Sequence, residues 1–168
     1  MKPEPFSNVE LLSDWKRRVR ESQFAHYNAA KPLIRANYLL GVPVTILTTF
    51  VGTALFATLE KQAASTNFRL SIGFISVIAA VLASMQTFLR FSERAEKHRG
   101  VAARYGSLRR DIEALQAGGA PFDQTKLDTI REKLNSISTE APEISERIWA
   151  RTEAILKARS KSDQAEAK

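Results

Sequence analysis

The sequence contains no cysteine, and this absence removes several kinds of chemistry at once. Disulfide bonds, thiolate metal ligands and cysteine nucleophiles are all excluded. Two histidines are present, His26 and His98, but no cysteine or clustered carboxylate completes a metal site around either. A glycine-rich phosphate loop and a serine nucleophile elbow are also missing. We therefore expect a protein that is not an enzyme and that uses no cofactor or metal.

Charge is missing from two long segments, although 26% of all residues are charged. Residues 38–59 and 70–89 are 22 and 20 uncharged positions. At about 1.5 Å per residue, these segments would form helices roughly 33 Å and 30 Å long. Both lengths match a bilayer hydrocarbon core of about 30 Å. Two buried helices of a soluble bundle are the alternative, but so small a chain would struggle to cover them.

Basic residues beside the two segments predict the orientation of the protein in a membrane. Six Lys or Arg side chains lie within residues 16–35 and five within residues 90–104, whereas residues 60–69 contain only Lys61 and Arg69. Because cytoplasmic flanks are rich in Lys and Arg, both termini should be cytoplasmic. The net charge of +7 is then explained by this topology and by contact with anionic lipid. No direct nucleic-acid partner is expected.

The predicted fold class is an all-α membrane protein, a two-helix transmembrane hairpin with a cytoplasmic helical bundle formed by N- and C-terminal helices. Its expected parts are an N-terminal amphipathic helix (1–37), two spans (38–59 and 70–89) joined by a short external loop (60–69), cytoplasmic helices (90–158) and a disordered tail (159–168).

Several helix ends can also be predicted. Ser7 is a candidate N-cap, and Pro32 should interrupt the first helix. Pro43 should bend or loosen the first span. The second span should continue without a break past residue 89, until Gly118 and the residues after it stop the helix. A third helix should bear Leu127, Ile130, Leu134 and Ile137, and a fourth should begin near Pro142.

Apolar residues of the flanking helices recur at alternating steps of three and four, which indicates a coiled-coil-like seam. His26 and His98 both fall on this seam. We interpret His98, which has Glu93, Glu96 and Lys97 nearby in the sequence, as a polar contact at a helix interface that could respond to pH. The candidate cytoplasmic seam residues are Trp15, Phe91, His98, Tyr105, Ile112 and Trp149.

Each span has one side of small or hydroxylated residues. In the first span these side chains fall within an arc of about 140° when residues are placed 100° apart. Such faces can pack the hairpin and its copies together, or they can line a polar path in an oligomer; both interpretations stay open. Neither span contains an ionisable residue, which argues against proton relay and voltage sensing. The candidate residues are Gly41, Thr45, Thr48, Thr49, Gly52, Thr53, Ser76, Ser84 and Thr87.

Several short motifs occur in a recognisable order. They are Gln23-Phe-Ala-His26-Tyr27, Asn37-Tyr-Leu-Leu-Gly41-Val-Pro43, Ala83-Ser-Met-Gln86-Thr-Phe-Leu-Arg-Phe91, Glu93-Arg-Ala-Glu96-Lys-His98-Arg99, Ala102-Ala-Arg-Tyr105, and Ala141-Pro142-Glu-Ile-Ser followed by Trp149. In order and spacing this pattern resembles the SLATT domain family, over residues 15–158.

The resemblance implies a two-transmembrane effector of a bacterial conflict system that uses nucleotide signals or nucleic-acid sensing. Such an effector would form homo-oligomers in the inner membrane and act in antiphage defence by abortive infection, through a pore or membrane disruption. Its trigger would come from a cytoplasmic sensor, from a partner that makes a nucleotide signal, or from a ligand bound by the helical bundle. The alternative from another functional class is a membrane-anchored scaffold or adaptor that positions a cytoplasmic partner.

Overall fold

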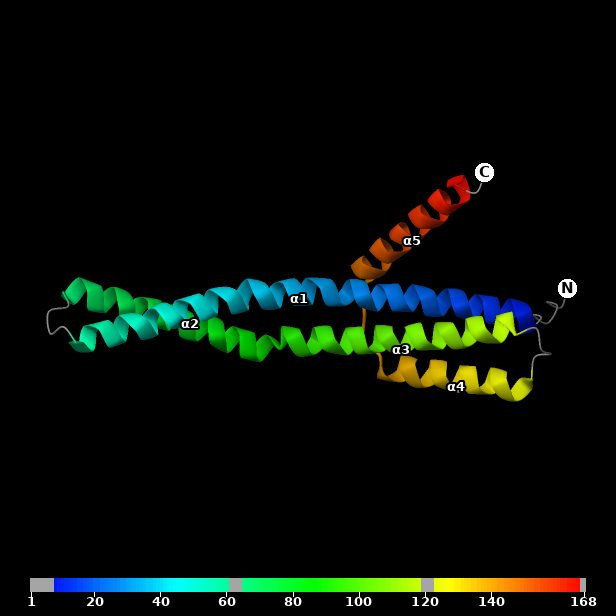
Figure 1. Ribbon diagram of the computed structural model, residues 1–168, viewed down its shortest axis with the longest axis horizontal. Helices are drawn as coiled ribbons and strands as arrows, with labels where there is room; N and C mark the ends of the chain where they lie inside the picture. The colour runs from blue at the N-terminus through cyan, green and yellow to red at the C-terminus, as the bar shows by residue number, and fades with distance from the viewer. Residues whose placement is uncertain (1–7, 61–64, 119–122, 167–168) are drawn as a thin grey trace. The chain divides into compact units, whose positions relative to one another are not determined.

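The computed structural model describes residues 8–60, 65–118 and 123–166, and every regular element in these ranges is a helix (Figure 1). The helices are α1 (Asn8–Glu60), α2 (Thr66–Leu89), α3 (Phe91–Ala117), α4 (Gln124–Glu140) and α5 (Glu146–Glu166). The all-α fold class is therefore confirmed. The chain divides into two compact units, unit 1 (Met1–Lys31 and Ala95–Lys168) and unit 2 (Pro32–Arg94).

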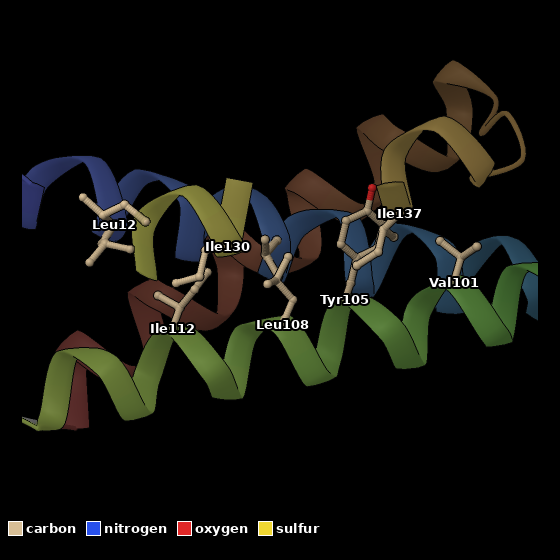
Figure 2. Close-up of a cluster of buried hydrophobic side chains, with 9 residues drawn as sticks. Leu12, Val101, Tyr105, Leu108, Ile112, Ile130 and Ile137 are labelled. Carbon is tan, nitrogen blue, oxygen red and sulfur yellow. The ribbon is translucent and has the colours of Figure 1, made fainter. Parts of the chain in front are cut away.

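Unit 1 is a helical bundle with one apolar core. The first part of α1 and α3 lie side by side in opposite directions, and α4 runs back along α3 (Figure 1). Leu12 of α1 and Leu108 and Ile112 of α3 are almost completely buried, and Ile130 and Ile137 of α4 cover them (Figure 2). Because the apolar residues of each helix recur at steps of three and four, each helix presents one continuous apolar stripe to this core.

The predicted third helix is confirmed. Asp123 caps α4, since its side chain accepts a hydrogen bond from the backbone N–H of Thr125 at 3.1 Å. The helix ends at Glu140, because the next residue, Ala141, is extended before Pro142. The predicted end of α3 is also confirmed, since the helix stops at Ala117, directly before Gly118.

The fifth helix begins later and ends later than the sequence predicts. The carbonyl of Ser145 accepts the N–H groups of Ile148 and Trp149 at 2.9 and 3.2 Å, so α5 starts at Glu146 and not near Pro142. α5 then continues to Glu166, through the part of the chain where we expect a disordered tail. At the beginning of this part, the Arg159 guanidinium packs over the ring of Phe24, 5.5 Å from its centre.

The interruption predicted at Pro32 is wrong, because α1 contains both Pro32 and Pro43 and ends only at Glu60. A proline inside a helix removes one backbone hydrogen bond and favours a kink, but packing on either side can hold the helix together. Ala29 and Ala30 are buried in unit 1 directly before Pro32. This packing holds the backbone helical up to the proline.

Unit 2 consists of the second part of α1 and of α2. Ser65 caps α2, as its hydroxyl accepts the N–H of Phe68 at 3.4 Å. The helix therefore begins at Thr66, inside the expected loop, of which residues 61–64 lie outside the described part of the chain.

At its other end, α2 does not continue without a break as the sequence predicts. Arg90 adopts a left-handed backbone conformation (φ 45°, ψ 42°) and separates α2 from α3. The helical hydrogen-bond pattern resumes at once, because the N–H of Arg94 donates to the carbonyl of Arg90 at 3.0 Å.

Candidate functional site

The helices of unit 2 contact each other along a strip of mostly bulky residues. On α2, Ile72 and Ala79 are buried. Gly41 lies against the Gln86 side chain, whose Nε2 atom would be 3.0 Å from a Cβ atom at that glycine. A set of half-buried residues of α1 recurs at steps of four and three, as in a coiled coil; it consists of Leu40, Val44, Leu47, Val51 and Ala54.

Most of the hydroxylated residues predicted in the spans lie outside this contact strip. The four threonines Thr45, Thr48, Thr49 and Thr53 are exposed, as are Ser84 and Thr87 of α2. Gly41, Gly52 and Ser76 are half-buried. Within one chain, the threonine side of α1 is therefore available for contact with another molecule. We call Thr45, Thr48, Thr49 and Thr53 the threonine face.

The hydroxyl groups of the threonine face donate hydrogen bonds to the backbone of their own helix. Thr45 donates to the carbonyl of Gly41 at 2.9 Å, Thr49 to that of Thr45 at 2.7 Å, and Thr53 to that of Thr49 at 2.9 Å. An unpaired hydroxyl is costly in an apolar environment, so this bonding suits a surface without water. Each oxygen can still accept a further hydrogen bond from a neighbouring helix or from water.

The remaining outer surface of unit 2 is strongly apolar. Phe56, Leu70, Phe74 and Phe88 are 75%, 74%, 69% and 86% exposed. An exposed apolar surface of this kind indicates a membrane or another apolar partner rather than water. Two helices of the chain are long and apolar enough to cross a membrane, and in the apolar 18-residue stretch of each only 6% and 11% of the residues are buried inside the protein.

The seam of unit 1 contains a buried pair of histidines. The Nδ1 atoms of His26 on α1 and His98 on α3 are 3.0 Å apart, and only 4% and 8% of the two residues is exposed. The ring of Tyr105 stacks on His26 with 5.8 Å between ring centres, and the Tyr105 hydroxyl is 3.3 Å from the Ser138 hydroxyl of α4. A polar layer thus connects α1, α3 and α4.

Burial, and to a smaller extent the nearby charge of His98, lowers the pKa of His26 from 6.5 to about 4. Among the residues that the structure describes, no group of three or more His, Asp or Glu side chains gathers as a metal site. The arrangement is therefore a hydrogen-bonded histidine pair in which it is unfavourable for both imidazoles to be positively charged at the same time.

The other seam residues take different positions. Tyr105 and Ile112 are buried in the core, and Trp15 packs against it partly buried. Trp149 is half-buried on α5, whereas Phe91 belongs to unit 2. The sequence indicates that both histidines lie on a seam, but not that they face each other.

Sequence reasoning missed a close contact between Gln23 and Gly106. A Cβ atom at Gly106 would lie 2.6 Å from the Gln23 Nε2 atom, so any larger residue at this position would force the Gln23 side chain to shift. The Oε1 atom of Gln23 is buried without a hydrogen-bond partner. The signal in the sequence is a glycine in the middle of a helix, where it lowers helix stability and therefore needs another reason.

Gly106→Ala is expected to lower the free energy of unfolding of unit 1 by about 1–2 kcal/mol, because the new methyl group displaces Gln23. In a Gln23→Ala background the same change should instead stabilise the unit by roughly 0.5–1 kcal/mol, since only the gain in helix propensity remains. Denaturant titration of the unaltered protein, the two single variants and the double variant, followed by circular dichroism, measures this change of sign. Equal effects in both backgrounds would contradict the contact.

An open groove of about 430 Å³ lies between α3 and α4. Charged side chains line it, and several of them form ion pairs: Lys133 contacts Asp111 at 2.8 Å, and Arg104 contacts Glu140, which lies outside the groove. These pairs are exposed and contribute little to stability. A ligand in this groove would have to replace existing pairs.

Comparison of the chain with protein-family models, with curated proteins and with solved structures finds no match.

Proposed function

We propose that unit 2 spans the bacterial inner membrane as a helical hairpin and that copies of the protein assemble there to permeabilise it during antiphage defence. The observation that carries this proposal is an apolar two-helix unit whose hydroxylated side is not used within the chain. Both termini, and with them unit 1, would lie in the cytoplasm.

The membrane position is supported by exposure and length together. The exposed phenylalanines and leucines of unit 2 would be costly in water at about 25 cal/mol per Å² of apolar surface, and lipid removes this cost. The basic residues Arg35, Arg90 and Arg94 of unit 2 are exposed. They can contact anionic headgroups on the cytoplasmic side.

Assembly is supported by the threonine face. A single pair of helices encloses no path for ions, so a pore requires several copies. Small and hydroxylated residues allow close approach of membrane helices and hydrogen bonds between them. Because the threonine hydroxyls already donate to their own backbone, the face can lie in lipid before assembly and accept hydrogen bonds after it.

The defence role is supported by the resemblance to SLATT domains. In this proposal unit 1 receives the trigger, either from a cytoplasmic sensor or nucleotide-producing partner or from a ligand bound directly.

Replacement of Thr45, Thr49 and Thr53 by valine tests the pore. Valine has nearly the same shape as threonine but has no hydroxyl, so the spans should insert normally while the polar path is lost. In phage-infected bacteria that express the protein, we expect entry of a membrane-impermeant dye to fall to the level of cells without it. Ile46→Val and Leu55→Val, on exposed positions of the same helix, are the matched control and should leave dye entry unchanged. Intact membranes in infected cells with the unaltered protein would disprove permeabilisation.

A scaffold or adaptor is the second candidate, and the separate core of unit 1 favours it. A bundle with its own core can position a cytoplasmic partner while unit 2 acts only as an anchor. In that case the valine variant should keep full protection against phage, whereas Tyr105→Ala, which breaks the polar layer of unit 1, should abolish it.

A further inference from the structure

The seam between α1 and α3 is apolar at Leu12, Val19 and Ile112 but polar at the His26–His98 pair. A polar pair inside a largely apolar seam favours one register of the two helices, because a shifted register would leave each polar group unpaired. These are the only two histidines in the sequence. Any titration of histidine in this protein therefore reports on this one contact.

The 3.0 Å distance restricts how many protons the pair can hold. Since both contacting atoms are Nδ1, one imidazole must donate its N–H and the other must accept with a lone pair. A neutral pair fulfils this condition, and so does a pair with one extra proton. With two extra protons, both nitrogens are donors and two positive charges face each other at 3.0 Å. The contact cannot survive in that state.

Among the residues that the structure describes, the contacts given for His26 include no negatively charged side chain. On α3 it faces His98 and the ring of Tyr105, whose hydroxyl is near Ser138 of α4. The adjoining turns of α1 place the uncharged Gln23 and Ala30 beside it.

Helix α5 contacts α1 at Asn28, which donates to Thr152 at 3.1 Å, and at Phe24, which lies under the positively charged Arg159. The charged group that shifts the pKa of His26 is His98 itself. A proton added to His26 would therefore meet only neutral or positive neighbours among these contacts.

We propose that the His26–His98 pair is a proton-sensitive clamp that holds α1 against α3 at neutral pH and releases the seam on acidification. The clamp lies in unit 1 and does not depend on whether unit 2 forms a pore. It provides a way for a drop in cytoplasmic pH to loosen the helical bundle.

The direction of the effect follows from linkage. The pKa of His26 is lowered from 6.5 to about 4 in the closed seam, and an open seam restores the ordinary value. The closed seam is therefore favoured fully above pH 6.5, and this advantage is lost as the pH falls toward 4. Between pH 7 and pH 5.5 the ratio of open to closed seam should rise about tenfold, and by pH 4 about a hundredfold.

Nuclear magnetic resonance of the full chain with ¹⁵N-labelled histidine, in detergent micelles, tests the clamp without any substitution. We expect one imidazole to carry its proton on Nδ1 and the other on Nε2 at pH 7.5, and one of the two to titrate far below pH 6.5. Two independent titrations near pH 6.5, or the same tautomer for both rings, would overturn the proposal.

His26→Asn supplies a second test, because asparagine places a neutral hydrogen-bonding group near the former Nδ1 position. The midpoint of urea unfolding of the unaltered protein should fall between pH 7 and pH 5.5, and that of the variant should change much less. Trp149→Phe in both proteins leaves Trp15, which packs against the core, as the only tryptophan reporter. Equal pH dependence in both proteins would refute the clamp. Loss of the pH response on addition of a metal chelator would also refute it, because a bound metal ion would then cause the response.

Discussion

Ile112→Ala is expected to lower the free energy of unfolding of unit 1 by about 2–5 kcal/mol, since it opens a cavity in the middle of the core. Ile112 has no exposed surface and lies where α1, α3 and α4 meet, close to Leu12 and Ile130 (Figure 2). Loss of this side chain therefore weakens three helices at once. Urea unfolding in detergent, followed by circular dichroism and Trp15 fluorescence, measures the change.

Val9→Ala is the matched control for this prediction. Val9 is on α1 in the same unit but is 56% exposed, so its truncation should change the stability by at most about 0.5 kcal/mol. An Ile112→Ala effect as small as that of Val9→Ala would mean that α4 does not cover α3 as described.

Ile46→Lys combined with Phe50→Lys is expected to abolish stable insertion of the first span. Each lysine near the middle of a membrane helix costs about 2.5–3.5 kcal/mol on insertion scales. Ile46 and Phe50 are 63% and 54% exposed, so neither lysine would disturb packing within the helix pair. The fraction of protein that resists alkaline carbonate extraction from bacterial membranes should fall sharply.

Lysines at Val9 and Tyr27 serve as the control for insertion. Both residues are exposed on α1 but lie outside the span, so this double variant should stay in the membrane fraction like the unaltered protein. Carbonate release of the unaltered protein itself would show that unit 2 does not span a bilayer, and its apolar surface would then require a protein partner.

Much of the helical organisation could be predicted from local patterns. The uncharged segments 38–59 and 70–89 lie on α1 and α2, and the spacing of Leu127, Ile130, Leu134 and Ile137 identified α4 with the correct buried side. These features depend on neighbours a few residues away. The break at Arg90 and the late start of α5 were missed, because backbone conformation at a single residue leaves little trace in an apolar pattern.

The candidate sites, too, could be predicted from the sequence only in part. Helical periodicity placed the threonines on one side of the first span, but it left open whether that side faces α2. In the structure, Leu47 and Val51 are half-buried in the contact between α1 and α2, whereas Thr45 and Thr49 are exposed. Which side of a helix meets its neighbour depends on the fit of both surfaces, and one helix alone does not contain that information.

The sequence by itself determined where apolar helices form, because charge and hydrophobic spacing act over a few turns. It also determined that no thiol chemistry occurs. Only the tertiary structure decided that His26 meets His98 across 72 positions of chain, that the Gln23 side chain lies against Gly106, and that the threonine face is exposed. Contacts between distant helices depend on how whole surfaces pack, so they appear only when the helices are brought together.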